Sequence, residues 1–435
     1  MSWSYPQALQ YLYGLQRHGI KPGLGTISAL LARLHDPHQR YRILHIGGTN
    51  GKGSVAAMTA TILQAANMRV GLYTSPHLND FRERIRVKQN PIPPERVATL
   101  AEQIRMVLSP SLSPTFFEFT TAMAFQHFAE ETVDVAVVEV GMGGRFDATN
   151  VCNPVGAAIT NVALDHEAYL GTTLTAIARE KAGIIKRQVP VVIGPMPHEA
   201  RRVIEDYATA QRAPLYRYGR EFHVSLSPEN GLDTFDYQGI RDIYPHLTCA
   251  LAGRHQLLNA GCAIALLEVS GLLDQGSREA AVRTGLATVK WEGRLETVEV
   301  APRLLLDGAH NPAAAAELAP YLQQLQTRAR GGKTLVLVGM MRDKDIQGFL
   351  SHLLSVGDVF IFTQINHPRA ASVQELHARL CDETKPAYLC PAPGDALSLA
   401  RRLAAPQDVI CVTGSLFLVG YVKRLLCGQE HLFPQ

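Results

Sequence analysis

Short apolar runs alternate with amphipathic stretches along most of the chain. The runs are continuous and rich in β-branched residues, which is typical of buried parallel strands. In the first two thirds of the chain they cover residues 43–46, 70–73, 133–140, 157–162 and 189–193. Helical periodicity lies between several of them, for example over residues 173–186, and broken helical pieces precede them over residues 5–34. This alternation predicts a doubly wound α/β fold.

The alternation is interrupted once and then begins again. Residues 215–244 are more polar and less regular, which predicts a small antiparallel excursion on the first domain. After a loop at residues 291–294, the pattern predicts a second set of elements: strands at 304–306, 334–338, 359–362 and 409–412, and helices at 313–325 and 416–426. We expect the domain boundary near residues 295–301, because the second stretch is long enough to be an independent α/β domain.

Composition narrows the class of protein. The 435 residues are 46% hydrophobic and 19% charged, as in an ordinary globular protein, and the net charge of +3 does not favour a nucleic-acid or membrane partner. The seven cysteines are scattered without a CxxC pair, which indicates reduced thiols rather than disulfides or a zinc site. With no secretion signal or membrane-length apolar run, we expect a cytoplasmic protein.

A glycine-rich loop follows the first predicted strand and precedes a helical pattern over residues 55–66. It reads Gly48, Thr49, Asn50, Gly51, Lys52, Gly53, Ser54. Glycines let successive backbone N–H groups point inward at a helix N-terminus and bind phosphates, with the lysine on the outer phosphates and a hydroxyl on Mg²⁺. Here the hydroxyl comes one residue later than usual. The alternative is a glycine-rich turn with a solvated lysine.

Polar residues also occur where other predicted strands end, which is where open α/β sheets bind ligands. Glu139 lies inside the apolar run before Val140, and such an acid is costly to bury unpaired, so a metal is a plausible partner. The alternative is a carboxylate held by backbone N–H groups of the following glycine loop. His166 follows the next strand and is a candidate ligand of a second cation. Lys181, on a predicted helix, is by itself an ordinary solvated charge.

A further segment carries candidate substrate contacts. Ser75 and His77 follow the second strand, and residues 81–88 would place four basic side chains on one face if the run is extended. Such a face suits an anionic substrate, or else it protects an exposed edge strand by its charge. Residues 116–120 add aromatic surface that could stack on a flat ring, although aromatics at this spacing are more often core.

The second domain has a comparable strand-to-helix junction at residues 306–312. Asn311 is placed to cap the helix and Pro312 fits its first turn. A cap requires neither Asp307 nor His310, which therefore become candidate ligand-binding residues.

Together these motifs resemble the folylpolyglutamate synthase/dihydrofolate synthase family, a branch of the ATP-dependent Mur-ligase type enzymes. The resemblance covers essentially the whole chain, and its motifs lie at residues 11–12, 23–24, 45–54, 73–78, 139–150, 164–166, 180–184, 255–260 and 307–312. It implies an N-terminal phosphate-loop ATPase domain with a mostly parallel sheet over residues 1–296, which also holds the folate site. A smaller Rossmann-like α/β domain, the glutamate-ligase domain, would cover residues 297–435.

The resemblance also implies roles for individual residues. ATP would contact the loop from Gly48 to Ser54 together with Asn259, Arg294 and Asp307. Mg²⁺ would be held by Ser54 and Glu139 with Ser75 nearby, and His166 would serve a second ion. Lys181 matches a position that the family often carries as a carbamylated lysine, and His310 would lie near the incoming amino acid. The catalytic set is then Lys52, His166, Lys181 and His310, and the expected folate contacts are His77, Arg82, Phe117, Thr120 and Asp147.

The activity so implied is ATP-dependent addition of L-glutamate to folate, and also to dihydropteroate, through an acyl-phosphate intermediate, by a protein that is a monomer. Two other hypotheses stay open on the residues alone. A phosphate-loop kinase or ATPase with a regulatory second domain explains residues 48–54 but leaves residues 307–312 and the pair Glu139 and His166 unexplained. A nucleotide-sensing scaffold would bind ATP without turnover.

Overall fold

The computed structural model describes residues 3–18, 23–226, 234–329, 331–382 and 384–428, and these fall into two compact units. Unit 1 consists of Met1–Ala163, Glu167–Ala250 and Gln256–Val289. Unit 2 consists of Leu164–His166, Leu251–His255 and Lys290–Gln435, so two short segments from the first part of the chain belong to it. The chain passes from unit 1 to unit 2 for the last time between Val289 and Lys290, and the boundary at residues 296 and 297 stays a prediction.

Unit 1 is built on an eight-stranded sheet with the order β4-β3-β2-β5-β1-β6-β7-β8. The strands from β2 to β8 in that order are parallel, while β3 and β4 form an antiparallel edge. Their bounds are β1 Arg42–Gly47, β2 Val70–Tyr73, β3 Ile85–Val87, β4 Asn90–Pro91, β5 Val135–Glu139, β6 Gly156–Ile159, β7 Val191–Ile193 and β8 Leu215–Arg217. The predicted parallel strands are confirmed. β3 lies within residues 81–88, for which an exposed edge strand was one of the two alternatives, whereas β4 was not predicted because it is too short to give a pattern.

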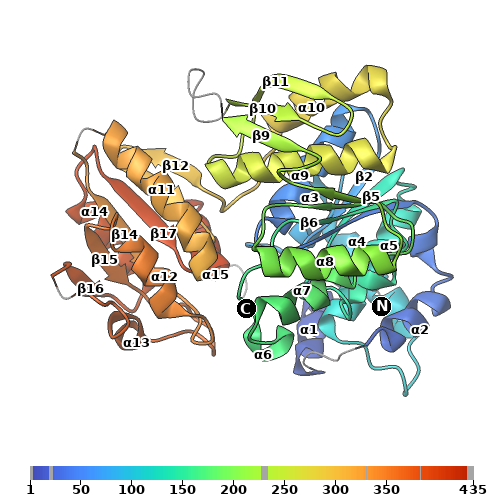
Figure 1. Ribbon diagram of the computed structural model, residues 1–435. Helices are drawn as coiled ribbons and strands as arrows, with labels where there is room; N and C mark the ends of the chain where they lie inside the picture. Colours follow the sequence, from blue (N-terminus) through green and yellow to red (C-terminus); the bar gives the residue numbers. More distant parts are fainter. Residues whose placement is uncertain (1–2, 19–22, 227–233, 330, 383, 429–435) are drawn as a thin grey trace. The chain divides into compact units, whose positions relative to one another are not determined.

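Helices cover both faces of this sheet (Figure 1). Ile43 and Val138 share one core with the N-terminal helices and α5, and α7 and α8 pack further along the same face. Leu44, which points to the opposite face, lies near Leu266 of α9. The helices are α1 Tyr5–Gly14, α2 Gly25–Arg33, α3 Lys52–Ala65, α4 Pro94–Met106, α5 Phe116–Glu130, α6 Glu167–Leu170, α7 Leu174–Ala182, α8 His198–Ala210, α9 Arg254–Ser270 and α10 Gln275–Thr288. The doubly wound pattern is therefore confirmed.

A small antiparallel sheet of β11, β10 and β9 forms the predicted excursion. Its strands are β9 His223–Leu226, β10 Thr234–Gln238 and β11 Ile243–Thr248, next to α9 in Figure 1. It is anchored on α9 by Glu268, whose carboxylate accepts hydrogen bonds from the Tyr237 hydroxyl at 2.8 Å and from two backbone N–H groups at 3.0 Å. The start of the predicted segment, β8, instead extends the parallel sheet.

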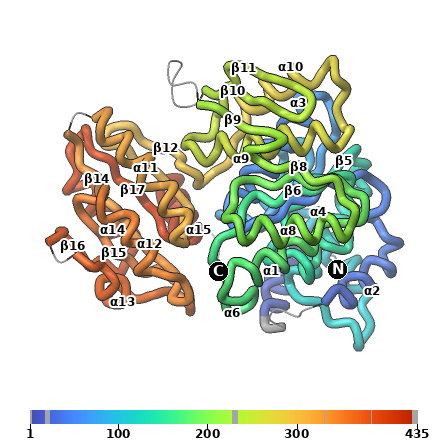
Figure 2. Tube along the Cα trace, viewed as in Figure 1, coloured from blue at the N-terminus to red at the C-terminus, as the bar shows by residue number. Residues whose placement is uncertain are grey.

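Unit 2, most of which is drawn in orange to red in Figure 2, contains a six-stranded sheet. The strand order is β12-β13-β17-β14-β15-β16, and all strands are parallel except β12. Its strands are β12 Glu296–Val300, β13 Arg303–Leu306, β14 Thr334–Val338, β15 Val359–Phe362, β16 Ala387–Leu389 and β17 Val409–Thr413. Its helices are α11 Pro312–Arg328, α12 Ile346–Leu353, α13 Val373–His377, α14 Pro393–Leu403 and α15 Leu416–Leu426. All four predicted strands are confirmed, and β12 and β16 are additional. No helix of the described residues is long and apolar enough to cross a membrane.

Candidate functional site

The glycine loop connects the central strand β1 of unit 1 to the N-terminus of α3. Gly48 and Gly51 have φ values of 141° and 80°, which L side chains rarely adopt. A Cβ atom at Gly48 would lie 1.9 Å from Thr160 Oγ1, and one at Gly51 would lie 2.5 Å from Asn259 Oδ1. Both positions therefore require glycine, and the predicted strand, loop and helix are present.

Side chains at the end of β6 hold this loop in place. The Thr160 hydroxyl donates to the Asn50 carbonyl at 2.6 Å, and the Asn50 N–H donates to Asn161 Oδ1 at 2.9 Å. The Thr49 hydroxyl donates to the Ala163 carbonyl at 3.2 Å. Lys52, at the first position of α3, places its Nζ 3.0 Å from the Thr49 carbonyl. The loop is thus a preorganised turn with a positive charge at a helix N-terminus, which favours an anion.

Lys181 is directed at the same loop. It lies on α7, is 3% exposed, and its Nζ donates to the Gly48 carbonyl at 2.8 Å. The structure therefore excludes the ordinary interpretation of Lys181 as a solvated surface charge. Burying a lysine ammonium costs free energy, so the position of Lys181 beside the phosphate loop indicates a functional role rather than a contribution to stability.

Glu139 ends β5 and is buried. Its Oε2 accepts a hydrogen bond from the Ser75 N–H at 3.0 Å, so the structure brings together two of the four residues expected at the metal. Ser54 is also buried, in the first turn of α3. A hydroxyl and a carboxylate are the hard oxygen ligands that suit Mg²⁺, which usually takes few protein ligands and completes its shell with phosphate and water. The described residues contain no group of three or more His, Cys, Asp or Glu side chains that could hold a metal.

The expected folate contacts surround an aromatic cluster in unit 1. The Tyr73 hydroxyl lies 3.2 Å from Thr120 Oγ1, and the Tyr73 and Phe117 rings are 6.0 Å apart. A Cβ at Gly141 would meet the Phe117 ring at 2.5 Å, so the loop after β5 is packed against this ring. His77 accepts a hydrogen bond on Nδ1 from Arg84 Nε at 2.7 Å.

The basic run at residues 81–88 differs from the extended conformation that we considered. Phe81–Arg84 is a 3₁₀ helix and only Ile85–Val87 is a strand, so the four basic side chains do not share one face. Arg82 pairs with Asp80 at 2.6 Å. Arg84 is 8% exposed and its guanidinium lies 5.3 Å from the centre of the Phe116 ring. Arg84 was not singled out from the sequence; its position in the basic run that follows the second strand is the signal that could have indicated it.

Asp147 follows the glycine loop after β5 and is buried. Its carboxylate accepts hydrogen bonds from the Met142 N–H at 2.9 Å, the Thr149 N–H at 3.0 Å and the Thr149 hydroxyl at 2.5 Å. Burial raises the pKa of Asp147, and these hydrogen bonds counteract part of that rise. The residue thus organises the loop between Gly141 and Thr149.

In unit 2, the junction between β13 and α11 has the predicted cap. Asn311 Oδ1 accepts a hydrogen bond from the Ala314 N–H at 2.9 Å, and Pro312 is the first residue of α11. Asp307 is buried and accepts from the Leu295 and Ala309 N–H groups, both at 2.9 Å. The Leu295 contact brings the Arg294 segment beside Asp307, so these two predicted nucleotide contacts are neighbours. Asn259 lies instead in unit 1, against Gly51.

Asp165 is the centre of a charged cluster in unit 2 that the sequence analysis did not identify. Its carboxylate lies 2.6 Å from Lys344 Nζ, 3.0 Å from Asn311 Nδ2 and 3.6 Å from His310 Nε2. Burial acts to raise the pKa of Asp165, but its interactions with His310, His166 and Lys344 outweigh it and hold this pKa below its ordinary value. His166, the expected ligand of a second ion, belongs to the same unit. Lys344 follows β14, so the rule on strand ends could have found it.

His310 itself is oriented by the backbone. Its Nδ1 lies 2.8 Å from the Gly308 carbonyl, which can only accept, so Nδ1 carries a proton. In the neutral imidazole the lone pair is then on Nε2, which faces Asp165. This tautomer leaves Nε2 able to take up a proton next to a carboxylate that would stabilise the resulting cation.

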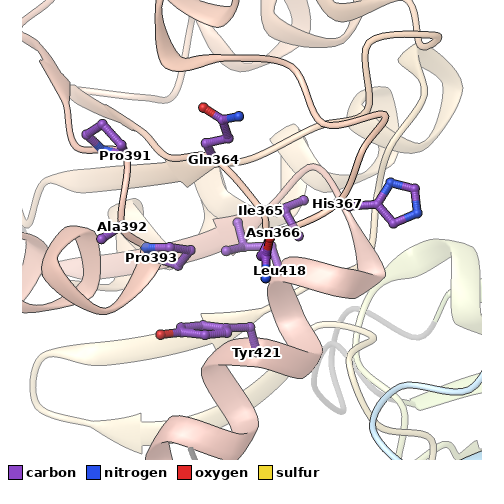
Figure 3. A pocket seen from close by; sticks show the side chains of 9 residues that line it. All are labelled: Gln364, Ile365, Asn366, His367, Pro391, Ala392, Pro393, Leu418 and Tyr421. Carbon is purple, nitrogen blue, oxygen red and sulfur yellow. The ribbon is translucent and has the colours of Figure 1, made fainter. Parts of the chain in front are cut away.

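A separate pocket of about 490 Å³ lies at the carboxyl ends of β15 and β16 in unit 2. Figure 3 shows the Tyr421 ring below Pro393, Asn366 beside Leu418, and His367 pointing away from the other labelled side chains. Its lining residues are Gln364, Ile365, Asn366, His367, Pro391, Ala392, Pro393, Leu418 and Tyr421. No residue expected to contact ATP, metal or folate lines this pocket.

Comparison with known proteins gives two family matches. Residues 46–267 match the Mur ligase middle domain, and residues 293–416 match the Mur ligase, glutamate ligase domain. Among curated proteins, the chain is 33% identical to a dihydrofolate synthase/folylpolyglutamate synthase of Bacillus subtilis over 441 residues, which cover 98% of this chain and 100% of the relative.

Solved structures give the same result. E. coli FolC in complex with DHPP and ADP superposes with a TM-score of 0.89 at 32% identity, covering 97% of this chain and 98% of that one. The bifunctional folylpolyglutamate synthase/dihydrofolate synthase of Yersinia pestis, complexed with AMPPNP and a Mn ion, has a TM-score of 0.87 at 35% identity and covers 98% of both chains. The paired Mur ligase domains and this likeness over nearly the full length show that the chain belongs to the dihydrofolate synthase/folylpolyglutamate synthase family of Mur ligases.

Proposed function

We propose that this protein is an ATP-dependent ligase that adds L-glutamate to reduced folates and to dihydropteroate. The observation that carries the proposal is the phosphate loop of unit 1, in which two glycines with positive φ place Lys52 at the N-terminus of α3 and Lys181 against Gly48. A phosphate loop alone also fits a kinase. The glutamate ligase domain and the full-length likeness to folate ligases favour the ligase.

The proposed reaction has two steps. In the first, the folate carboxylate attacks the γ-phosphorus of ATP, which forms an acyl phosphate and releases ADP. In the second, the amine of glutamate attacks the acyl carbon, the amide bond forms, phosphate leaves, and the amine gives up a proton. Because two anions meet in the first step, Lys52 and the loop N–H groups have to neutralise charge on the phosphates.

Mg²⁺ would be held by Ser54 and Glu139, with Ser75 beside Glu139, and a second ion by His166. The supporting observations are the buried oxygen ligands of unit 1 and the Mn ion present with AMPPNP in the Yersinia pestis relative. When bound, the ion supplies positive charge that offsets the phosphate charge. Replacing Glu139 with glutamine should raise the Mg²⁺ concentration needed for half-maximal activity, and an unchanged requirement would remove Glu139 from the metal site.

We further infer that Lys181 is carbamylated in the active protein. Its neutral amine would add to CO₂, losing one proton and giving a carbamate that carries a negative charge in place of a positive one. The support is the burial of Lys181 beside the Gly48 carbonyl. Protein equilibrated with ¹³C-bicarbonate should show one carbamate carbon resonance that Lys181→Arg lacks. A spectrum without that resonance would leave Lys181 as a simple amine.

For the second step we propose His310 as the group that takes the proton from the glutamate amine. Its Nδ1–H is fixed on the Gly308 carbonyl, so Nε2 is the accepting nitrogen, and Asp165 stabilises the cation that forms. The folate would contact His77, Thr120, Phe117 and Asp147, with the ring against Phe117. Arg82 stays a prediction here, because its charge is paired with Asp80.

The deciding experiment incubates purified protein with ATP, Mg²⁺ and L-glutamate, and compares dihydropteroate with tetrahydrofolate as the acceptor. Sustained ADP formation should require both a pteridine acid and glutamate, and mass spectrometry should show each acceptor extended by glutamate. ADP formation that continues without either would favour a kinase or ATPase. ATP binding without turnover under every condition would favour a nucleotide-sensing scaffold.

The protein would act in the cytoplasm as a monomer. The scattered cysteines, with none paired in the described part of the chain, and the near-neutral net charge are compatible with that compartment. Light scattering should give a mass near 47.6 kDa at every concentration at which the enzyme is active. A mass that doubles over the active range would overturn the monomer.

A further inference from the structure

His45 is a buried histidine in the central strand of unit 1 that the mechanism above does not use. It lies in β1, where its neighbours across the sheet are Val138 and Ala157, and it is 0% exposed. The other described side chains of this strand that point inward are apolar. An imidazole at this position therefore breaks the pattern of a parallel core strand, which is apolar throughout.

A chain of hydrogen bonds runs from His45 to Asp147. His45 Nε2 lies 2.8 Å from Thr149 Oγ1, and the Thr149 hydroxyl donates to Asp147 Oδ1 at 2.5 Å. Because the hydroxyl has one proton and gives it to the carboxylate, His45 must be the donor to Thr149. His45 is thus the Nε2–H tautomer, and it supports the hydroxyl that in turn supports Asp147.

The second ring nitrogen of His45, Nδ1, indicates that packing alone does not explain why a histidine occupies this position. Its Nδ1 is buried and has no hydrogen-bond partner among the described residues. Burial lowers the pKa of His45 to about 3, with a smaller contribution from the charge of Lys186, so the ring is neutral at physiological pH. An apolar side chain would fill the same space without an unsatisfied polar atom, so the histidine costs stability that its hydrogen bond to Thr149 has to justify.

This chain of hydrogen bonds ends at the loop after β5, which lies on the substrate side of the proposed site. Asp147 Oδ2 accepts the Met142 N–H at 2.9 Å, and Gly141, the residue before Met142, packs on the Phe117 ring. The orientation of the Asp147 carboxylate therefore sets the position of the backbone that lies against Phe117. Both residues are expected folate contacts.

We propose that His45 is a positioning residue for the pteridine substrate: through Thr149 it fixes the Asp147 carboxylate and the loop that packs on Phe117. The inference rests on the proposed function, since it assigns the pteridine to that loop. His45 itself touches neither substrate nor phosphate. Its loss should therefore change the affinity for the pteridine and leave the affinity for ATP and glutamate as it was.

The test compares His45→Leu, His45→Gln, Thr149→Val and Thr149→Ser in the full chain. Leucine fills the space without a donor, whereas the glutamine amide can replace the Nε2–H donor. We expect His45→Leu and Thr149→Val to raise the KM for the pteridine acid about tenfold, which is the effect of one lost hydrogen bond, with KM for ATP and glutamate changed less than about twofold. His45→Gln and Thr149→Ser should return the pteridine KM to within about twofold of wild type.

The control is His127→Leu, which removes another buried imidazole with an unpartnered Nδ1, on α5. It should leave the pteridine KM unchanged. The double variant of His45→Leu with Thr149→Val should have a pteridine KM no higher than that of either single variant, because both substitutions break the same chain of hydrogen bonds. Equal effects on the KM of ATP, an equal effect of His127→Leu, or additive losses in the double variant would overturn the proposal.

A measurement independent of activity separates this inference from the proposed function. The ¹⁵N chemical shifts of His45 should report a neutral Nε2–H ring between pH 5 and 8 in wild type, and a loss of the Nε2 hydrogen bond in Thr149→Val. If wild type makes no glutamate adduct, the proposed function has failed. If wild type is active but His45 is the Nδ1–H tautomer or titrates in this range, only the positioning role has failed. Should His45→Leu not fold, Thr149→Val against Thr149→Ser decides the question.

Discussion

Lys52 carries the clearest prediction at the scale of single residues. Its Nζ lies on its own loop, 3.0 Å from the Thr49 carbonyl, at the N-terminus of α3. Lys52→Ala should lower kcat by at least about 100-fold, because charge moves onto the phosphates in the transition state, while ADP affinity falls much less. Stopped assays of ADP release measure kcat, and calorimetry measures the affinity for ADP. Lys333→Ala, an exposed lysine of unit 2, is the control and should behave as wild type.

Arg84 and Arg82 offer a second comparison between single residues. Among the described residues, the Arg84 guanidinium makes one hydrogen bond, from Nε to His77, and no ion pair, whereas Arg82 is paired with Asp80. An unpaired buried guanidinium is costly unless a ligand completes it. Arg84→Gln should therefore raise the KM of the pteridine acid about tenfold, and Arg82→Gln much less. The opposite ranking in steady-state assays would return the role to Arg82.

At the scale of elements, the connection from β1 to α3 depends on the backbone conformation of Gly48. A methyl group there would collide with Thr160 Oγ1, which itself holds the Asn50 carbonyl. Gly48→Ala should abolish detectable ADP binding in calorimetry. Gly276→Ala is the matched control: it lies in α10 with open space around its Cβ position, and should leave ADP binding intact and add up to about 1 kcal/mol of stability. An ADP affinity within about twofold of wild type in Gly48→Ala would contradict the role of the loop.

The small sheet β9-β10-β11 depends on Glu268 in α9. Burial raises the pKa of Glu268 above its ordinary value of 4.5, although hydrogen bonds from Ile240, Tyr237 and Asp242 act against it. The folded state therefore binds a proton more tightly than the unfolded state. The free energy of unfolding should fall as pH rises from 4.5 through the folded-state pKa, and level off above it.

Glu268→Gln should remove this pH dependence. It should also destabilise the sheet by about 1–3 kcal/mol at pH 7. Both carboxylate oxygens of Glu268 accept a backbone N–H, so the amide nitrogen of glutamine would place one donor against another. Hydrogen exchange of the β10 and β11 amides, followed against pH, measures both effects. A slope that persists in Glu268→Gln would assign the titration to another group.

At the scale of the whole molecule, the two units are interleaved along the chain. Leu164–His166 belongs to unit 2, although unit 1 precedes and follows it in sequence. Asp165 thereby neutralises Lys344, whose side chain is 11% exposed. A fragment that starts at Lys290 would contain Lys344 without its carboxylate.

Lys344→Met should therefore have opposite effects in the two contexts. In the full chain it leaves Asp165 without its nearest cation and should destabilise unit 2 by roughly 3 kcal/mol. In the fragment it removes an unpaired buried charge and should stabilise the fragment. Urea unfolding of wild type and Lys344→Met, each as the full chain and as the fragment, measures the sign of the stability change in both contexts. The same sign in both contexts would show that Asp165 is not the partner that matters.

How far the sequence led can be judged on particular elements. Strands such as β2, β14 and β15 were predicted with their observed bounds, because a buried parallel strand is apolar along its whole length. The predicted helix over residues 173–186 ends at Ala182 in the structure, and the short edge strands β4 and β16 were missed. Edge strands are short and partly exposed, so their pattern does not differ from that of a loop.

The candidate site divides in the same way. The phosphate loop, Glu139, Asp307 and the Asn311 cap could be predicted because their chemistry depends on local order: a glycine, a strand end, a helix start. The chain of His45, Thr149 and Asp147 could not, because residues 45 and 149 are distant in sequence and meet only across the sheet. For the same reason the partners of Lys181 and Arg84 could not be predicted. The single basic face expected for an extended run is absent, because residues 81–84 form a 3₁₀ helix.

By itself, the sequence determined the class of fold and the residues able to bind phosphate, since hydrophobic periodicity and backbone freedom act over a few neighbouring positions. Only the tertiary structure decided which charges are paired, which imidazole nitrogen carries a proton, and that Asp165 belongs to unit 2. Those properties arise from burial and from contacts between residues that are distant in sequence. Away from water, a polar group without a partner costs more free energy, so its partner determines its charge and protonation.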